Sequence, residues 1–168
     1  MLVPNYDFYK GKVVVITGAG GVLCGVLAEA YAKVGCKVAL LDLSFERADE
    51  CASRLREAGC VARAYACNVL QPESIKKAHE AILNDLGKCD ILVNGAGGNN
   101  PKATTDDEYF APDHAGQMKT FFDLDKEGVE FVFNLNFLGT LLPTQVFAKD
   151  MLEKEDASII NISSMNAF

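Results

Sequence analysis

The stretch Val13-Val14-Val15-Ile16-Thr17-Gly18-Ala19-Gly20-Gly21-Val22-Leu23-Cys24-Gly25 decides the fold of this 168-residue chain. A run of β-branched residues ends in a cluster of glycines, and a helical pattern follows at once. This order predicts a strand, a tight turn and a helix. Glycines let the backbone turn sharply and approach a ligand, and a helix N-terminus offers unpaired N–H groups to an anion. We therefore expect Gly18, Gly20 and Gly21, with Val22 and Leu23, to bind phosphate. A plain tight turn is the alternative.

The rest of the chain alternates short apolar segments with amphipathic ones. Strands are predicted at residues 12–17, 37–42, 61–67, 90–94 and 158–163, and helices at 22–34, 45–58, 72–86 and within 124–153. Gly35, Gly59 and Gly87 follow the first three helices, as C-terminal glycines do. This alternation predicts an α/β, Rossmann-type doubly wound parallel sheet in three layers, with strand order 3-2-1-4-5. A ligand is then expected at the carboxyl ends of the first and fourth strands.

Two helices have apolar faces that can be predicted from spacing. In the first helix the apolar positions are Val22, Val26, Leu27, Ala30, Tyr31 and Val34. In the long helix they are Phe131, Val132, Leu135, Leu138, Leu142 and Val146.

Residues 95–123, between the fourth strand and the long helix, are rich in Gly, Asn, Pro, Thr and Asp. Long loops inside compact domains are usually functional or disordered.

Composition narrows the class of partner. The net charge of −7 disfavours nucleic acids and anionic membranes, which attract basic surfaces. The apolar runs are shorter than a membrane span and no signal peptide is recognisable, so we expect a cytoplasmic protein. The six cysteines lack Cys-x-x-Cys spacing and only two histidines could join them, so we expect reduced thiols and no metal site. We predict one domain over residues 1–168.

Asp42 ends the second predicted strand, 24 residues after Gly18. A carboxylate there accepts the ribose hydroxyls of adenosine and repels a 2′-phosphate, although a solvated acid is also common at a strand end. No Lys or Arg stands at positions 43–46, so the predicted cofactor is NAD rather than NADP. Leu43 follows Asp42, and Asn68 and Val69 follow the third strand, where an amide can reach the adenine edge.

Several motifs together resemble the short-chain dehydrogenase/reductase family. They are Thr17-Gly18-Ala19-Gly20-Gly21, Asp42, Asn94-Gly95-Ala96-Gly97, Asn136 and Ile162-Ser163-Ser164, in the family's order over nearly the whole chain. The resemblance implies an NAD-dependent oxidoreductase with a small-molecule substrate, often a homotetramer. It implies that Ser164 stabilises charge on the substrate oxygen and that Asn136 holds a water in a proton relay. Asn94, Gly95, Ala96 and Gly97 would lie against the cofactor.

A narrower resemblance concerns the substrate. Residues 20–24, the loop from Asn94 onward and the segment Asn136-Phe137-Leu138-Gly139-Thr140 are similar to members acting on sugar acids of the D-mannonate and D-fructuronate kind. Asn99 and Lys102 would then contact the substrate, with Lys102 pairing with its carboxylate. A solvated loop is the alternative.

The sequence departs from the family at two places. Val22 and Cys24 stand where the family usually has glycines, and no Tyr-x-x-x-Lys pair follows Ser164. Tyr6 and Lys10 have that spacing but precede the first strand. We therefore predict an N-terminal portion of a longer enzyme, lacking its C-terminal strands. A non-catalytic dinucleotide-binding module is the second hypothesis, and an S-adenosylmethionine-dependent methyl transferase is a distant third.

Overall fold

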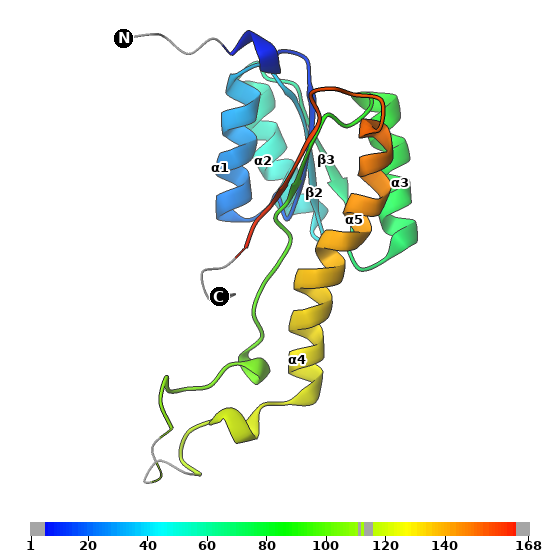
Figure 1. The fold of residues 1–168 in the computed structure, drawn as a ribbon. Helices are drawn as coiled ribbons and strands as arrows, with labels where there is room; N and C mark the ends of the chain where they lie inside the picture. Colours follow the sequence, from blue (N-terminus) through cyan, green and yellow to red (C-terminus); the bar gives the residue numbers. More distant parts are fainter. Residues whose placement is uncertain (1–5, 111, 113–115, 164–168) are drawn as a thin grey trace, which may run out of the picture.

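A computed structural model describes residues 6–110, 112 and 116–163. They contain one five-stranded sheet in the order β3-β2-β1-β4-β5, and every neighbouring pair is parallel (Figure 1). The strands are β1 (Val13–Thr17), β2 (Lys37–Asp42), β3 (Ala62–Ala66), β4 (Ile91–Asn94) and β5 (Ser158–Asn161). The predicted Rossmann-type α/β class and the strand order 3-2-1-4-5 are confirmed.

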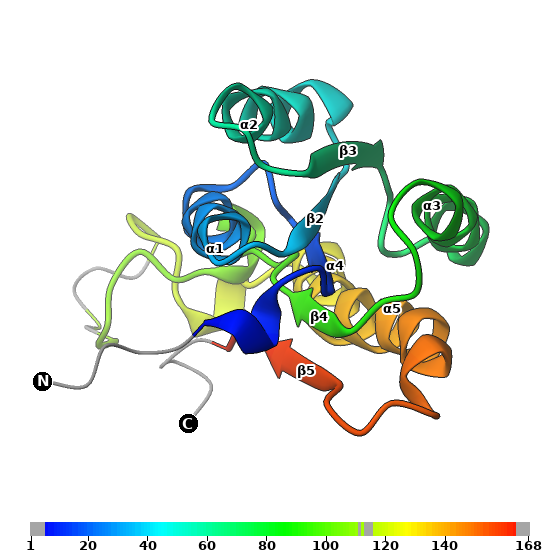
Figure 2. The same cartoon turned by 90° about the horizontal axis from the view of Figure 1, so that it is seen from above.

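Helices cover both faces of the sheet, as Figure 2 shows from above. One face is covered by α1 (Val22–Lys33) and α2 (Phe45–Glu57), and the other by α3 (Pro72–Asp85) and α5 (Gly139–Phe147). Gly35, Gly59 and Gly87 follow the first three helices with φ of +89°, +82° and +112°. These left-handed conformations end the helices where glycine was predicted to end them.

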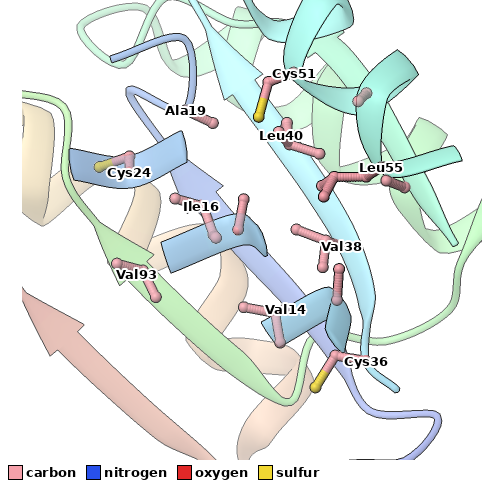
Figure 3. Close-up of a cluster of buried hydrophobic side chains, with 14 of the residues drawn as sticks. Val14, Ile16, Ala19, Cys24, Cys36, Val38, Leu40, Cys51, Leu55 and Val93 are labelled. Carbon is pink, nitrogen blue, oxygen red and sulfur yellow. The ribbon is translucent and has the colours of Figure 1, made fainter. Parts of the chain in front are cut away.

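The core beneath α1 differs from the sequence-based prediction. Cys24, Ala28 and Ala32 are the buried residues of α1, and they pack on Val14, Ile16, Val38 and Leu40 of the sheet (Figure 3). Val22 and Val26 were predicted on the apolar face, yet Val22 is 90% exposed and Val26 60%. Helical spacing alone does not choose between two neighbouring stripes. The stripe of small side chains is the buried one, because small side chains let the helix axis approach the sheet closely.

The opposite face has its own core, made by α3, α5 and the other side of the strands. Its buried residues include Val15, Leu92, Ile75, Ile82 and Phe147. A polar contact connects α3 to the residues after α5 at the amino end of the sheet. His79 Nε2 lies 3.0 Å from both carboxylate oxygens of Asp150, and the Cys89 N–H donates to Asp150 Oδ2 at 3.0 Å.

The long helix is continuous but irregular. It consists of α4 (Lys126–Phe133), a π turn η5 (Asn134–Leu138), α5 and a short 3₁₀ turn η6 (Ala148–Met151). The π turn holds an extra residue, so α4 and α5 do not share one regular stripe. Phe131, predicted on the buried side, is 44% exposed, whereas Pro143 and Phe147 of α5 are buried.

The same helix bears on the expectation about membranes. Within the described part of the chain, Lys126–Met151 is one helix that is long and apolar enough to cross a membrane by length and composition, and its most apolar 18-residue window has mean hydropathy 1.3. The prediction that the apolar runs are too short was wrong by this criterion. The run is weak evidence for a membrane span, because its α5 portion packs on the sheet through Phe147.

Residues 95–125 connect β4 to α4, where a connection over residues 95–123 was predicted, and most of the described part projects away from the sheet beside α4 (Figure 1). We call residues 99–125 the arm. It contains the 3₁₀ turns η2 (Pro101–Ala103) and η4 (Phe121–Asp123). The Asp125 N–H donates to the Lys102 carbonyl at 3.0 Å and joins the two ends of the arm. At the N-terminus, where no periodicity was found, a 3₁₀ turn η1 (Asp7–Tyr9) precedes β1.

β5 is the edge strand of the described sheet. All four of its residues are exposed, and Ile159 and Ile160 are 39% and 40% accessible. This apolar strand therefore lies at an edge of the described sheet.

The buried thiols of Cys36 and Cys67 predict how stability changes in alkaline solution. Burial raises the pKa of both to about 11, whereas an exposed thiol has a pKa of about 8.5. As pH rises, the unfolded chain therefore loses these protons before the folded one does. The contribution of these protonated thiols to the free energy of unfolding is complete below about pH 8.5 and is lost as the pH rises to about 11. Each thiol lowers the free energy of unfolding by at most about 1.4 kcal/mol for each pH unit.

We expect the free energy of unfolding, measured with urea under reducing conditions, to fall between about pH 8.5 and pH 10.5. The Cys67→Ala variant should show a shallower decline, since one of the buried thiols with a raised pKa is absent. Equal slopes in both proteins would contradict the assignment to Cys67.

Candidate cofactor and active site

The candidate site lies where β1 and β4 end side by side. These strands are parallel neighbours, with Ile16 opposite Val93, and the chain leaves them toward opposite faces of the sheet. This is the switch point at which open α/β sheets bind ligands. The structure brings the predicted glycine turn and the segment after β4 together here.

The turn after β1 is built from the main chain. Gly18 has φ +68°, and a Cβ on it would lie 2.9 Å from Ala96 Cα and from the Gly95 carbonyl oxygen. Thr17 Oγ1 accepts the N–H groups of Gly95 and Ala96, each at 3.1 Å. The Thr17 hydroxyl therefore joins the turns after β1 and β4, and main-chain atoms of the two turns approach each other so closely at position 18 that glycine is required there.

The first turn of α1 has no side-chain cap. Gly21 is its N-cap residue, and no side chain accepts a hydrogen bond there. The N–H groups of this turn lack intrahelical acceptors, so they remain available to an anion. Val22 and Leu23 are exposed beside them.

Cys24 shows how the departure from the family's glycine pattern is accommodated. Its side chain belongs to the core beneath α1 (Figure 3). Its sulfur occupies the space that a Cβ on Gly95 would need. Desolvation raises the pKa of the Cys24 thiol, and the nearby Asp42 adds to the rise. Cys24 is thus a neutral packing residue facing away from the phosphate side of the turn.

Asp42 lies at the end of β2, within reach of the glycine turn. Its Oδ2 accepts the Gly20 N–H at 2.9 Å, and its Oδ1 accepts the Ser44 N–H at 3.0 Å. The side chain is only partly buried, and each oxygen retains a further lone pair. The structure therefore places Asp42 beside the glycine turn, and its contact with an adenosine ribose stays a prediction.

Arg47 is a neighbour of Asp42 that the sequence analysis missed. It lies in the first turn of α2, and its guanidinium donates to the Gly20 carbonyl at 3.1 Å. Positions 43–46 contain no cation, and Arg47 follows them directly. Helical geometry after the Ser44 N-cap would have brought position 47 back toward β2, because the cap oxygen accepts the Arg47 N–H at 3.4 Å.

The residues predicted beside the adenine have different environments. Leu43 is exposed, whereas Val69 is buried. Val69 packs closely on Gly139, since a Cβ added to Gly139 would lie 3.1 Å from the Val69 side chain. Asn68 Oδ1 accepts the Leu70 N–H at 3.0 Å, so this amide oxygen shapes its own turn. Its contact with adenine stays a prediction.

Asn136 lies inside the π turn and binds the segment after β4. Its Oδ1 accepts the Gly98 N–H at 3.0 Å, and its Nδ2 donates to the carbonyls of Gly98 (2.9 Å) and Val132 (3.0 Å). A Cβ on Gly97 would lie 2.7 Å from Asn136 Oδ1. The Asn136 amide is thus engaged within the protein, and π turns often mark functional positions.

The remaining predicted residues are less closely grouped. Ser164 lies outside the described residues. Asn99 and Lys102 are on the arm, where the Asn99 amide donates to Thr104 at 2.8 Å and Lys102 Nζ lies 4.0 Å from Asp125. Tyr6 and Lys10 precede β1 and so lie at the amino end of the sheet, opposite the glycine turn. Among described residues, no three His, Cys, Asp or Glu side chains form a metal-binding group.

Comparisons with known proteins agree with this geometry. A sequence profile described as short chain dehydrogenase matches residues 12–168. An uncharacterized oxidoreductase of Haemophilus influenzae is 60% identical over 95% of this chain and 56% of its own length. The uncharacterized oxidoreductase UxuB of Bacillus subtilis is 42% identical over 99% of this chain and 59% of its own.

A solved structure is similar as well. It is a Haemophilus protein crystallised with NAD and proposed to be a D-mannonate oxidoreductase. It has a TM-score of 0.92 and 60% identity, over 95% of this chain and 57% of that one. Fold and comparisons thus define one class, a Rossmann-type α/β protein with oxidoreductase relatives. Within that class, the chain belongs to the short-chain dehydrogenase family. It spans somewhat more than half the length of these relatives.

Proposed function

We propose that this chain forms the cofactor-binding part of an NAD-dependent oxidoreductase. The observation that carries the proposal is the position of Asp42, held by the Gly20 and Ser44 N–H groups at the edge of the glycine turn. A carboxylate there accepts the 2′- and 3′-hydroxyls of an adenosine ribose and repels a 2′-phosphate. The NAD found in the Haemophilus structure supports the choice.

The residues present fit a dinucleotide. A Cβ on Gly20 would lie 2.7 Å from Arg47 Cβ and 3.0 Å from Asp42 Oδ2, so only the bare main chain fits between these side chains. The uncapped start of α1 suits the pyrophosphate. When bound, NAD accepts or donates the hydride. Gly95 and Ala96 lie directly against the glycine turn, so the segment Gly95–Gly97 would run beside the cofactor. Ser164 would donate a hydrogen bond to the substrate oxygen.

The proposed substrate is a sugar acid of the D-mannonate or D-fructuronate kind, interconverted between alcohol and carbonyl. The activity proposed for the Haemophilus neighbour supports this choice, as do the polar side chains of the arm. Lys102 is the predicted carboxylate partner. It lies 4.0 Å from Asp125, so a substrate carboxylate would compete with Asp125 for it.

A dinucleotide-binding module without catalysis is the alternative. It would keep Asp42 and the glycine turn and would lack the Tyr and Lys that exchange the proton. The codons after Phe168 in the source gene separate the two hypotheses. A Tyr and a Lys four residues apart on a predicted helix support the enzyme, and a stop codon supports the module.

The cofactor proposal is tested by titrating the chain with NADH and NADPH. We expect NADH to bind at least about tenfold more tightly, since Asp42 repels the 2′-phosphate. In Asp42→Asn the dissociation constant for NADH should rise about tenfold, and that for NADPH should not. Nucleotide fluorescence reports both constants.

Arg47→Gln is the matched control, because it removes a charge beside the same glycine without touching the ribose acceptor. It should change the NADH-to-NADPH ratio less than Asp42→Asn does. Tighter binding of NADPH by the wild-type chain would overturn the choice of NAD, and absence of binding by either nucleotide would overturn the function.

Phe133 and Phe137, with Leu141, are exposed at positions four residues apart along the long helix. We propose that this side contributes to a homo-oligomer, a tetramer by resemblance to the family. We also propose a cytoplasmic location, which fits a nicotinamide-dependent enzyme of metabolism.

A further inference from the structure

One hydroxyl group lies where β4, β5 and α5 meet. Thr144 Oγ1 accepts a hydrogen bond from Asn94 Nδ2 at 2.9 Å and donates one to the Thr140 carbonyl at 2.8 Å. The same Asn94 Nδ2 donates to Asn161 Oδ1 at 2.9 Å. Thr144 thus connects a helix directly to the last residue of β4 and, through Asn94, to the last residue of β5.

The hydrogen bonds continue along the helix to the candidate site. Thr140 Oγ1 donates to the Asn136 carbonyl at 3.1 Å, and the Asn136 amide holds both polar main-chain atoms of Gly98. A contiguous series therefore runs from Asn161 through Asn94, Thr144 and Thr140 to Asn136. One end is the segment that leads to the candidate catalytic serine, and the other is the segment after β4.

We propose that Thr144 is a positioning residue that sets the π turn of Asn136 and the carboxyl end of β5 in fixed relation to each other. The inference rests on the proposed function only in that these two segments are taken to form the active site. It assigns Thr144 no contact with substrate or cofactor. Its role is exerted through Asn94 and Thr140.

The Thr144 hydroxyl is important because it accepts a hydrogen bond from a buried amide, that of Asn94. Asn94 is 2% exposed, and its Oδ1 has no hydrogen-bond partner among the residues that the structure describes. Its Nδ2 bonds to Thr144 and Asn161 are the contacts that orient the amide. Loss of one of them leaves a buried donor unsatisfied, which is costlier than losing an exposed bond. The amide would then reorient and release Asn161.

A purely local role is the competing explanation. Threonines in helices often donate to the carbonyl four residues earlier, as Thr140 and Thr144 both do. Such bonds alone would affect only their own turn of helix. The Asn94 contact spans 50 residues of sequence and joins different elements, so it predicts effects at a distance.

The test is amide hydrogen exchange of the 168-residue chain, measured by NMR. Two reporters do not touch Thr144: the Gly98 N–H, bonded to Asn136 Oδ1, and the Ile162 N–H, bonded to the Asn94 carbonyl. In Thr144→Val, which keeps the shape and removes the hydroxyl, we expect both to exchange about tenfold faster relative to the β1 core amides. Thr144→Ser should restore both to within about threefold of wild type.

Two further variants sharpen the result and remain informative if Thr144→Val fails to fold. Thr140→Val removes only the bond to Asn136, so it should accelerate Gly98 and leave Ile162 unchanged. Tyr65→Phe loses a hydroxyl bond to Asp85 at 3.0 Å, far from the site, and should leave both reporters unchanged relative to the core. The proposal is overturned if either reporter is insensitive to Thr144→Val, if Thr144→Ser does not rescue, or if Thr140→Val accelerates Ile162.

NADH titration of the same samples separates this inference from the proposed function. A wild-type chain that does not bind NADH refutes the function, while the exchange ratios still decide the role of Thr144. If NADH binds and the exchange ratios do not change, the positioning role alone fails.

Discussion

Gly18→Ala is expected to abolish detectable NADH binding and to lower the free energy of unfolding by about 3 kcal/mol. Two costs combine at this position. The φ of +68° is unfavourable for any residue with a Cβ, and the new methyl group would lie 2.9 Å from Ala96 Cα and the Gly95 oxygen. Main-chain atoms cannot move aside as a side chain can, so the turns after β1 and β4 must separate. Urea unfolding and NADH fluorescence measure the two effects.

Gly59→Ala provides a matched control for the conformational cost. Gly59 has a similar φ of +82°, but nothing lies within 4 Å of the added Cβ. We expect a loss of about 1 kcal/mol and unchanged NADH binding. The excess cost at Gly18 then measures the contact between the two turns. Equal losses of stability in both variants would show that this contact contributes nothing.

Gly95→Ala has the second of the two largest expected effects, a loss of about 2–3 kcal/mol with at least tenfold weaker NADH binding. The added Cβ would overlap the Cys24 sulfur and lie 3.0 Å from the Thr17 carbonyl oxygen. Relief requires α1 to move away from β4. That movement displaces the N–H groups offered to the pyrophosphate, so stability and binding fall together.

Cys24→Ala should partly rescue Gly95→Ala. Alone, Cys24→Ala removes a buried sulfur and should cost about 1 kcal/mol. In the double variant the new methyl group no longer overlaps the sulfur. The loss in free energy of unfolding should therefore be smaller than the sum of the two single losses by about 1 kcal/mol or more. The remaining Thr17 contact keeps the rescue incomplete. Additive losses in urea unfolding would refute the predicted overlap.

Sequence patterns predicted the parts of the fold that depend on local chemistry. Apolar strands, helix-ending glycines such as Gly35 and Gly87, and the glycine turn each have a nearby physical cause, and all three are observed. The position of Asp42 beside the glycine turn could be predicted because the end of a parallel strand and the turn beside it follow from topology alone.

Features that depend on distant pairings were not predictable. The π turn at Asn136 breaks the 3.6-residue period on which helical faces are assigned. The burial of Cys24 instead of Val22 depends on how closely α1 approaches the sheet. The contact of Thr144 with Asn94 joins residues 50 positions apart, and neither residue type alone predicts which residue it will contact.

The strand order also has a consequence for how the chain acquires structure during synthesis. β1, β2 and β3 pair with their neighbours in sequence, and the core under α1 and α2 draws mainly on residues 14–62, with Ile91 and Val93 arriving later. The opposite core needs Phe147 and Met151. Early, short-range contacts form fastest. We therefore expect the N-terminal half to be ordered on one side while the ribosome is still translating the helix that completes the other.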